Sequence, residues 1–321
     1  MAPGRTIRAT FAVTFIVGAV LTTGATAQTS PLPDGQAPDQ SAAQVDPAAK
    51  NLPSVTIESQ SELEKRVQTY VRKITSSTRF QRESLARWNK SLCFLVAGLP
   101  RRDAEFMVGR LTTVAQSVGA HVQARECSRR NANFYVVFTP DPALTLKYLK
   151  WHPKLLFDRD ANSVQINKFL QDSTPLPVRV WHNGELFGRN GMPVRTNITC
   201  AGFDTGNMPT NCEAGGTRLN VQALEGLTEA VIVFDANRIS GMNIGQLSDY
   251  TAMVGLVDLD INADLAQAPT ILRLFTQAEG SRPQGLTQWD QAFLSATYHT
   301  DQKSFDQRDT IARDVTRDLS H

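Results

Sequence analysis

The sequence lacks the side-chain patterns that most metal sites and hydrolytic sites need. It has five histidines in 321 residues, and no two of them lie three or four positions apart. No CxxC or CxxH spacing occurs, so no zinc site is indicated. A GxSxG nucleophile elbow and a phosphate-binding P-loop are also missing. These absences argue against zinc hydrolases, serine hydrolases of the elbow type and P-loop enzymes.

Long apolar runs are scarce as well. The run Phe11–Leu21 follows Arg5 and Arg8, and its 11 residues fall short of the roughly 20 that span a bilayer. The small side chains of Ala25-Thr26-Ala27 suit a signal peptidase. We therefore expect residues 1–27 to be a signal peptide cleaved after Ala27, the alternative being an uncleaved membrane anchor. Nothing later is apolar enough to span a membrane, so the sequence predicts a periplasmic or secreted protein.

Excess charge is missing too. The chain has 33 Lys and Arg against 31 Asp and Glu. Removing the two arginines of the predicted signal peptide leaves 31 basic residues against 31 acidic ones, so the mature chain is formally neutral. Overall charge therefore gives no support for a nucleic acid or an anionic membrane as a partner.

Cysteine is sparse, but all four cysteines lie in the part that we expect to be exported, where thiols are normally oxidised. They are Cys93, Cys127, Cys200 and Cys212. Four cysteines permit three pairings, and the sequence alone does not choose among them. The simplest hypothesis pairs Cys200 with Cys212, which bracket a loop rich in Gly, Asn and Pro, and leaves Cys93 to pair with Cys127.

What the sequence does contain is the pattern of one α+β domain. Residues 28–53 are mostly Pro, Gln, Ala, Ser and Asp, so we expect a disordered linker there and a single domain over residues 54–321. The domain begins with a helix over residues 61–74 and ends with one over residues 305–319, in which acids and arginines alternate. That last helix has an apolar stripe formed by Ile311, Val315 and Leu319. We expect the stripe to dock on its own domain or, alternatively, on a second chain.

Strands and helices alternate in the core. Apolar runs over residues 92–99 and 133–139 predict strands, and the segment between them, 103–119, has apolar residues on a helical face from Phe106 to Val118. A strand, a helix and a strand in this order indicate a βαβ unit. Further elements are strands over 178–184 and 229–239 and helices over 142–151, 244–255, 269–275 and 287–298. We predict a mixed sheet of four or five strands, a crossover helix and a helical C-terminal half.

The strand over 178–184 carries two candidate binding residues. It ends in Asn183-Gly184, which predicts a tight turn to a partner near Leu186. Trp181 and His182 lie on opposite faces because side chains alternate along a strand. We expect Trp181 in the core and His182 at an edge or in solvent; alternatively, Trp181 forms the wall of a groove.

Three landmarks carry a family resemblance: Val254-Gly255-Leu256, Pro269-Thr270-Ile271-Leu272 and Gly285–Tyr298. With the order of elements, they resemble the zincin fold of metzincin-type metalloproteases. There the first landmark ends the HExxH helix, the second is the turn with a Ser-Ile-Met sequence, and the third is a capped helix beneath the site. More closely, residues 88–298 resemble uncharacterised secreted proteins of proteobacteria whose C-terminal part is zincin-like without the metal motif.

Aligned on Gly255, this resemblance places Ser248 and Ala252 where the two zinc-binding histidines belong, and Asp249 where the general-base glutamate belongs. A hydroxyl and a methyl do not replace two imidazoles, and one aspartate does not lower the pKa of water. We therefore expect no metal, no cofactor and no catalytic residue. The alternative is a metal-independent hydrolase that uses Asp249 in a remodelled cleft.

Two interpretations of the helix over 244–255 stay open. In the first, its core face contains Leu247, Tyr250 and Val254, whereas Ser248, Asp249 and Thr251 are solvated. In the second, the cleft persists and binds a peptide, with an exposed edge of the strand at 178–184 accepting it by β-addition as the zincin resemblance implies. The sequence thus predicts an exported, non-catalytic binding or scaffolding protein with an unknown protein or peptide partner. Its candidate binding residues are Ser248, Asp249, Tyr250, Trp181 and His182.

Overall fold

A computed structural model of the chain describes residues 59–75, 85–124, 127–151, 169–170, 174–187, 224–302 and 306–320. All of these belong to one unit of the chain, Thr56–His321. The signal peptide and linker predicted for residues 1–27 and 28–53 lie outside the described residues, and so does the predicted bridge between Cys200 and Cys212.

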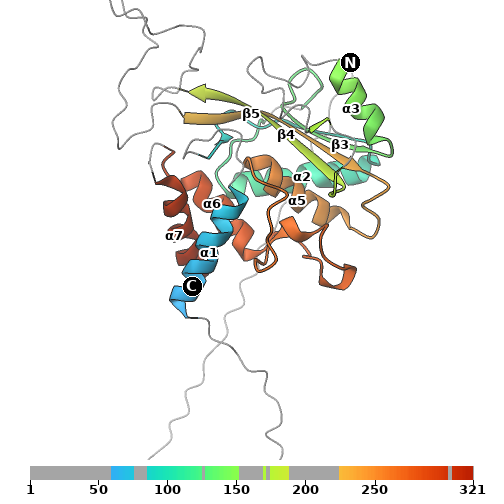
Figure 1. The fold of residues 1–321 in the computed structure, drawn as a ribbon. Helices are drawn as coiled ribbons and strands as arrows, with labels where there is room; N and C mark the ends of the chain where they lie inside the picture. Colours follow the sequence, from blue (N-terminus) through green and yellow to red (C-terminus); the bar gives the residue numbers. More distant parts are fainter. Residues whose placement is uncertain are drawn as a thin grey trace, which may run out of the picture. The chain divides into compact units, whose positions relative to one another are not determined.

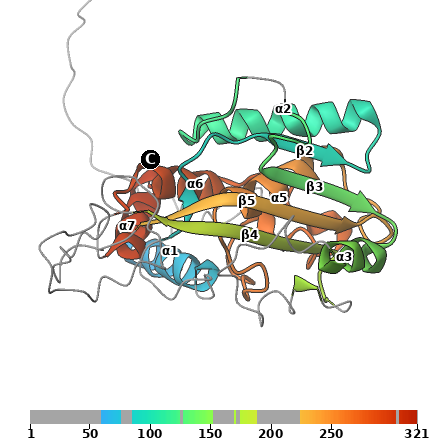
Figure 2. The same ribbon diagram turned by 90° about the horizontal axis from the view of Figure 1, so that it is seen from above.

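Five strands form one mixed, mostly parallel sheet. They are β1 (Arg87–Trp88), β2 (Phe94–Ala97), β3 (Phe134–Thr139), β4 (Val178–Phe187) and β5 (Leu224–Asp235). β5 lies between β3, to which it is parallel, and β4, to which it is antiparallel. β2 runs parallel to β3 on the far side, and β1 pairs with the start of β5 (Figure 2). The predicted mixed sheet is confirmed.

Helices cover both faces of the sheet. They are α1 (Gln60–Ile74), α2 (Arg101–Ser117), α3 (Pro142–Trp151), α5 (Ile244–Leu256), α6 (Gln288–His299) and α7 (Gln307–Leu319), with short 3₁₀ turns η2 (Ile271–Arg273) and η3 (Glu279–Ser281). α2 and α5 lie together against one face, α1, α6 and α7 pack beside them, and α3 lies by the other face (Figure 1). α2 is the predicted crossover, and after β5 the described chain is helical, as expected.

The alternation of side chains along β3 separates two apolar clusters. Phe134, Val136 and Phe138 are buried in the larger cluster, which fills the space between the sheet and α2, α5 and the terminal helices. Tyr135 and Val137 point the other way, toward a smaller cluster beneath α3. The members of this smaller cluster are Leu146, Phe169, Trp181, Val231 and Val233. Because β5 contributes to both clusters, it is buried on both faces, as expected of a central strand.

The closest approach of α5 to the sheet occurs at Gly255. A Cβ atom at this position would overlap the ring of Phe134, so only glycine lets the helix backbone lie directly on the strand. The indole N–H of Trp88 donates to the Gly255 carbonyl at 2.8 Å, which ties β1 to the same turn of α5. The glycine that marked this helix in the sequence thus has a packing role.

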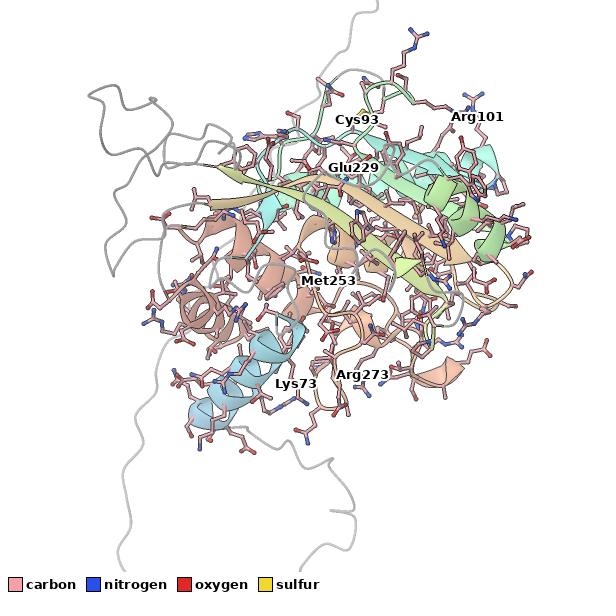
Figure 3. All side chains as sticks on the ribbon, turned by 45° about the horizontal axis from the view of Figure 1, so that its top comes forward. Lys73, Cys93, Arg101, Glu229, Met253 and Arg273 are labelled. Carbon is pink, nitrogen blue, oxygen red and sulfur yellow. A yellow bond between two sulfur atoms is a disulfide. The ribbon has the colours of Figure 1, made fainter. Side chains whose placement is uncertain are left out.

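A disulfide joins Cys93 to Cys127, with the two Cα atoms 5.5 Å apart. It links the segment before β2 to the segment between α2 and β3, as the simplest pairing hypothesis required (Figure 3). This bridge closes a loop that contains β2 and α2, and the closed loop restricts the unfolded chain.

Two local predictions are wrong. Asn183-Gly184 makes no tight turn: β4 continues to Phe187 with β5 beside it, and the register shifts between these two residues. The pairing passes from Glu229 to Leu227 and leaves Thr228 unpaired, so the extra residue lies on β5 and Asn183-Gly184 stays within β4. On α2, Phe106 is 50% exposed, whereas Met107, Leu111 and Val114 are buried. The rest of the predicted face is buried or packs on the larger cluster, where α5 lies against α2: Val108, Leu111, Val114, Ala115 and Val118. Only Phe106 is misplaced.

The stripe on α7 docks on its own domain, which was one of two expected outcomes. Ile311 and Val315 are fully buried in the larger cluster, and Leu319 packs against it. α7 lies against α6 and α1 (Figure 1).

Asp290 joins three segments at the start of α6. Its carboxylate is fully buried and accepts hydrogen bonds from the backbone N–H groups of Ile271 and Thr287 at 2.8 and 2.9 Å. Its other oxygen accepts from the hydroxyls of Thr270 at 2.5 Å and Tyr70 at 3.2 Å. α1, η2 and α6 are therefore held by one side chain. Burial raises the pKa of Asp290 above its ordinary value even though these donors act to lower it.

We expect Asp290→Asn to lower the free energy of unfolding by about 2 kcal/mol or more, because an amide nitrogen cannot accept the hydrogen bonds that a carboxylate oxygen accepts. The loss should also depend on pH. Since the folded state holds the Asp290 proton more tightly than the unfolded state, the contribution of this group to stability falls as pH rises through the interval between its ordinary pKa and its raised one.

Urea unfolding of both proteins from about pH 4 to about pH 7 measures this. The difference in unfolding free energy between the natural chain and the asparagine variant should shrink as pH rises. A difference that grows with pH would show that the hydrogen-bond donors outweigh burial.

Candidate functional site

The helix that carries the candidate residues is fixed at its start by side chains. The Asn243 carboxamide accepts from the backbone N–H of Gln246 at 2.9 Å, and the Gln246 side chain accepts from the backbone N–H of Asn243 at 3.0 Å. This capping box begins α5 at Ile244. Gln246 also donates to the Pro283 carbonyl at 2.9 Å, which holds the segment before α6 against the helix.

Asp249 is the best-connected candidate. Its carboxylate accepts two hydrogen bonds from the guanidinium of Arg110 on α2, at 2.6 Å from Nε and 3.0 Å from Nη2. It accepts a third from the backbone N–H of Leu286 at 2.9 Å. Asp249 is buried, and Arg110 lies over it with part of its side chain in solvent. The hydrogen bonds to Asp249 raise the pKa of Arg110.

The chain passes very close to this carboxylate just before α6. A Cβ atom at Gly285 would lie 2.6 Å from Asp249 Oδ2, so a larger residue there would push the segment away. The absence of a side chain at Gly285 lets the N–H of Leu286 reach Asp249. Asp249 thus links α2, α5 and the start of α6, and its oxygens are occupied by these partners.

The expectation that Ser248, Asp249 and Thr251 are solvated is wrong. Every residue of α5 from Gln246 to Leu256 is buried, because the sheet, α2, η2 and the segment before α6 surround the helix. The hydroxyls of Ser248 and Thr251 turn back onto the carbonyls of Ile244 and Leu247 at 2.6 and 2.7 Å. Figure 3 shows Met253 of the same helix in the middle of the molecule.

Tyr250 is a core residue, as the first of the two interpretations of this helix predicted. Its ring makes edge contacts with Phe234 and Phe275, at centroid distances of 6.5 and 4.7 Å. Within the described residues its buried hydroxyl has no hydrogen-bond partner. Burial raises the pKa of Tyr250 far above its ordinary value, so the phenol is neutral at physiological pH.

Trp181 and His182 point to opposite faces of β4, as predicted, but both are buried. Trp181 packs on Phe169 in the smaller cluster and donates its indole N–H to Asn183 at 2.8 Å. The expectation of an edge or solvent position for His182 is wrong: its Nδ1 lies 3.3 Å from Asp258 Oδ1, close after the end of α5. That face of β4 is covered because α5 and the segment after it pack beneath the strand.

The five candidate residues do not face one common space. Asp249 faces α2, Tyr250 faces the rings of β5 and the segment after η2, and Trp181 lies across the sheet from α5. In the ranges that the structure describes, nowhere do three His, Cys, Asp or Glu side chains gather as a metal site requires.

Two residues that hold this region together escaped the sequence analysis. Arg110 is one of several arginines on a helix, and nothing in the local pattern separates it from Arg101, which pairs with Glu105 on the same helix. Asp290 had one usable signal, the Thr287-to-Asp290 spacing of a capping box before an apolar run. That signal predicts a cap but not the contacts with η2 and α1.

A groove of about 280 Å³ lies elsewhere, between α1 and residues 264–268, with Tyr70 and Trp289 among its lining residues. The chain's own side chains bridge it: Arg66 donates to the Gln267 carbonyl at 3.1 Å, and Lys73 donates to the Asp264 carbonyl at 2.8 Å. Arg66 also lies over the Trp289 ring. The groove is therefore a seam that fastens α1 to the domain.

Comparisons with known proteins found no matching family model, no matching curated protein and no matching solved structure.

Arg110→Ala should lower the free energy of unfolding by about 1–3 kcal/mol, because it removes two charge-assisted hydrogen bonds and leaves the buried Asp249 with one backbone donor. The matched control is Arg101→Ala on the same helix. Its pair with Glu105 is exposed, so the change should have little or no effect on the free energy of unfolding. Urea midpoints at unchanged m-value compare the two, and equal effects would contradict a structural role for Arg110.

Tyr250→Phe should leave the free energy of unfolding unchanged or raise it by up to about 1 kcal/mol. The change removes a buried hydroxyl that makes no hydrogen bond to the described residues. Tyr298→Phe is the control, since the Tyr298 hydroxyl donates to the Leu256 carbonyl at 2.9 Å and its loss should cost about 1 kcal/mol. Thermal unfolding of both variants measures the difference. A marked loss in Tyr250→Phe would mean that its hydroxyl has a partner.

Proposed function

We propose that the protein is an exported, non-catalytic binding or scaffolding protein of the periplasm or cell envelope. The observation that carries the proposal is the position of Asp249. The competing hypothesis of a metal-independent hydrolase needs this carboxylate to reach a substrate or a water molecule. Instead it is buried and accepts hydrogen bonds from Arg110 and Leu286. We infer that Asp249 holds the fold together rather than moving protons.

Three features support export. The N-terminal residues have the charge, apolar run and small side chains of a signal peptide. The disulfide between Cys93 and Cys127 fits an oxidising compartment. In the described part of the chain, no helix is both long and apolar enough to cross a bilayer.

We also propose that the domain is a zincin-like fold that has lost its metal motif. Its sheet is mostly parallel with one antiparallel strand, β4, at an edge. α5, which would correspond to the metal-binding helix, lies beneath the sheet and ends at Gly255-Leu256. In this correspondence, Ser248 and Ala252 occupy the ligand positions, and both are buried.

The partner that we propose is a protein or peptide of the envelope. The candidate residues of α5 are packed against their own domain, so a partner would meet side chains on the exterior instead. We therefore propose that the partner binds exposed side chains on the outside of the domain rather than the former cleft.

The test combines metal analysis with activity profiling of the protein as cells export it. We expect less than stoichiometric transition metal and no turnover of ester, peptide or glycoside substrates. Asp249→Asn serves as the control variant, checked for folding by near-ultraviolet circular dichroism. Turnover that disappears in a folded Asp249→Asn protein would establish the hydrolase instead.

A further inference from the structure

Helix α3 has a second apolar face that points away from the domain. Leu144, Tyr148 and Trp151 lie four and three residues apart, so they share one side of the helix. They are 64, 56 and 74% exposed. On the opposite side Leu146 is buried in the smaller cluster and Leu149 packs against it. α3 is thus apolar on two sides, one in the domain and one in solvent.

Trp151 stands apart from the other tryptophans of the chain. Trp88, Trp181 and Trp289 are at most 8% exposed, as is usual for a large aromatic side chain in a core. Leaving such a side chain in water forgoes the free energy that burial would supply. A cluster of three large exposed apolar residues on one short helix therefore marks a surface that another molecule covers.

The charged side chains of α3 itself have one sign. Lys147 and Lys150 are exposed and lie along one side of the apolar stripe, and no acidic residue lies between Pro142 and Trp151. The nearest acid in the chain is Asp141, whose carboxylate accepts the backbone N–H of Leu144 at 2.9 Å as the helix begins. α3 lies on the outside of the domain (Figures 1 and 2).

We propose that the outward face of α3 docks on an anionic phospholipid surface. Tryptophan and tyrosine prefer the boundary between headgroups and acyl chains because they combine an apolar ring with a polar N–H or O–H. Leu144 adds apolar area on the same side. Lys147 and Lys150 extend their charged ends to lipid phosphates, where each lysine contributes a favourable electrostatic interaction.

The charge pattern disfavours a second copy of the chain as the occupant. A two-fold contact between two α3 helices would bring the lysines of both copies to the same interface, and like charges there oppose association. The neutral overall charge predicted for the mature chain provides no long-range attraction to membranes. Local charge acts within about 8 Å at physiological salt, however, so the two lysines on α3 favour a negatively charged bound surface.

This inference rests on the proposed export of the protein, but it does not depend on whether the protein is a catalyst. A membrane-bound enzyme and a membrane-bound scaffold would both show the docking. Activity profiling therefore tests the proposed function, and vesicle binding tests this one.

The experiment uses tryptophan fluorescence of the exported protein mixed with vesicles of equal parts phosphatidylcholine and phosphatidylglycerol. Because Trp151 is the only exposed tryptophan of the four in the chain, a blue shift of the emission reports its transfer out of water. We expect the shift with these vesicles, a much weaker one with phosphatidylcholine alone, and a decrease with added salt. Absence of a shift, or equal shifts with both lipids, would overturn the proposal.

Co-sedimentation with the same vesicles separates the helix face from the rest of the chain. Two variants change the proposed face: the single variant Trp151→Ser, and a double variant that carries Lys147→Glu and Lys150→Glu. Each should weaken vesicle binding about tenfold or more. Phe106→Ser is the matched control, because Phe106 is half exposed on α2 at the other face of the sheet, and it should bind as the natural chain does. Equal weakening by the control, or an emission shift that follows protein concentration without vesicles, would contradict lipid docking.

Discussion

The ion pair between the half-buried Arg110 and the buried Asp249 is the constraint on which the rest of the structure depends. It joins the crossover helix α2 to α5, and through Leu286 it reaches the segment that starts α6. A buried pair of this kind contributes little net stability relative to apolar packing, but a carboxylate left there alone is costly. The pair therefore specifies how these elements meet. The side chain at the position of a catalytic base in the zincin resemblance is committed to that task.

Asp290 also links several segments through its hydrogen bonds, at the start of α6. It caps α6, holds η2 through Thr270 and Ile271, and contacts Tyr70 of α1. Both carboxylates satisfy backbone N–H groups that would otherwise be buried without partners at irregular segments. The C-terminal half, which has no strands among its described residues after β5, is thus organised around two acidic side chains as well as its apolar core.

If α5 corresponds to the metal-binding helix of a zincin, as we propose, its candidate residues are buried where those of an active enzyme would be accessible. The helix that would face a substrate is packed on all sides, whereas α3, a short connecting helix, presents aromatic residues to solvent. Binding energy comes from desolvating such side chains rather than from polar groups that are already satisfied. This is why we place recognition on α3 and assign a structural role to α5.

Local sequence determined much of the fold. The βαβ unit and the order of strands and helices followed from periodicity and composition, which act over a few residues. The bond between Cys93 and Cys127 and the core position of Tyr250 were each one of several alternatives that the sequence left open. Tertiary structure alone decided three matters. Asn183-Gly184 stayed within a strand instead of turning because β5 pairs along the whole of β4. Asp249 became buried because Arg110, 139 residues away in the chain, meets it. Leu144, Tyr148 and Trp151 were left exposed because the sheet takes only the opposite side of α3. In each case the partner is distant in sequence, and no local pattern encodes which distant side chain will arrive.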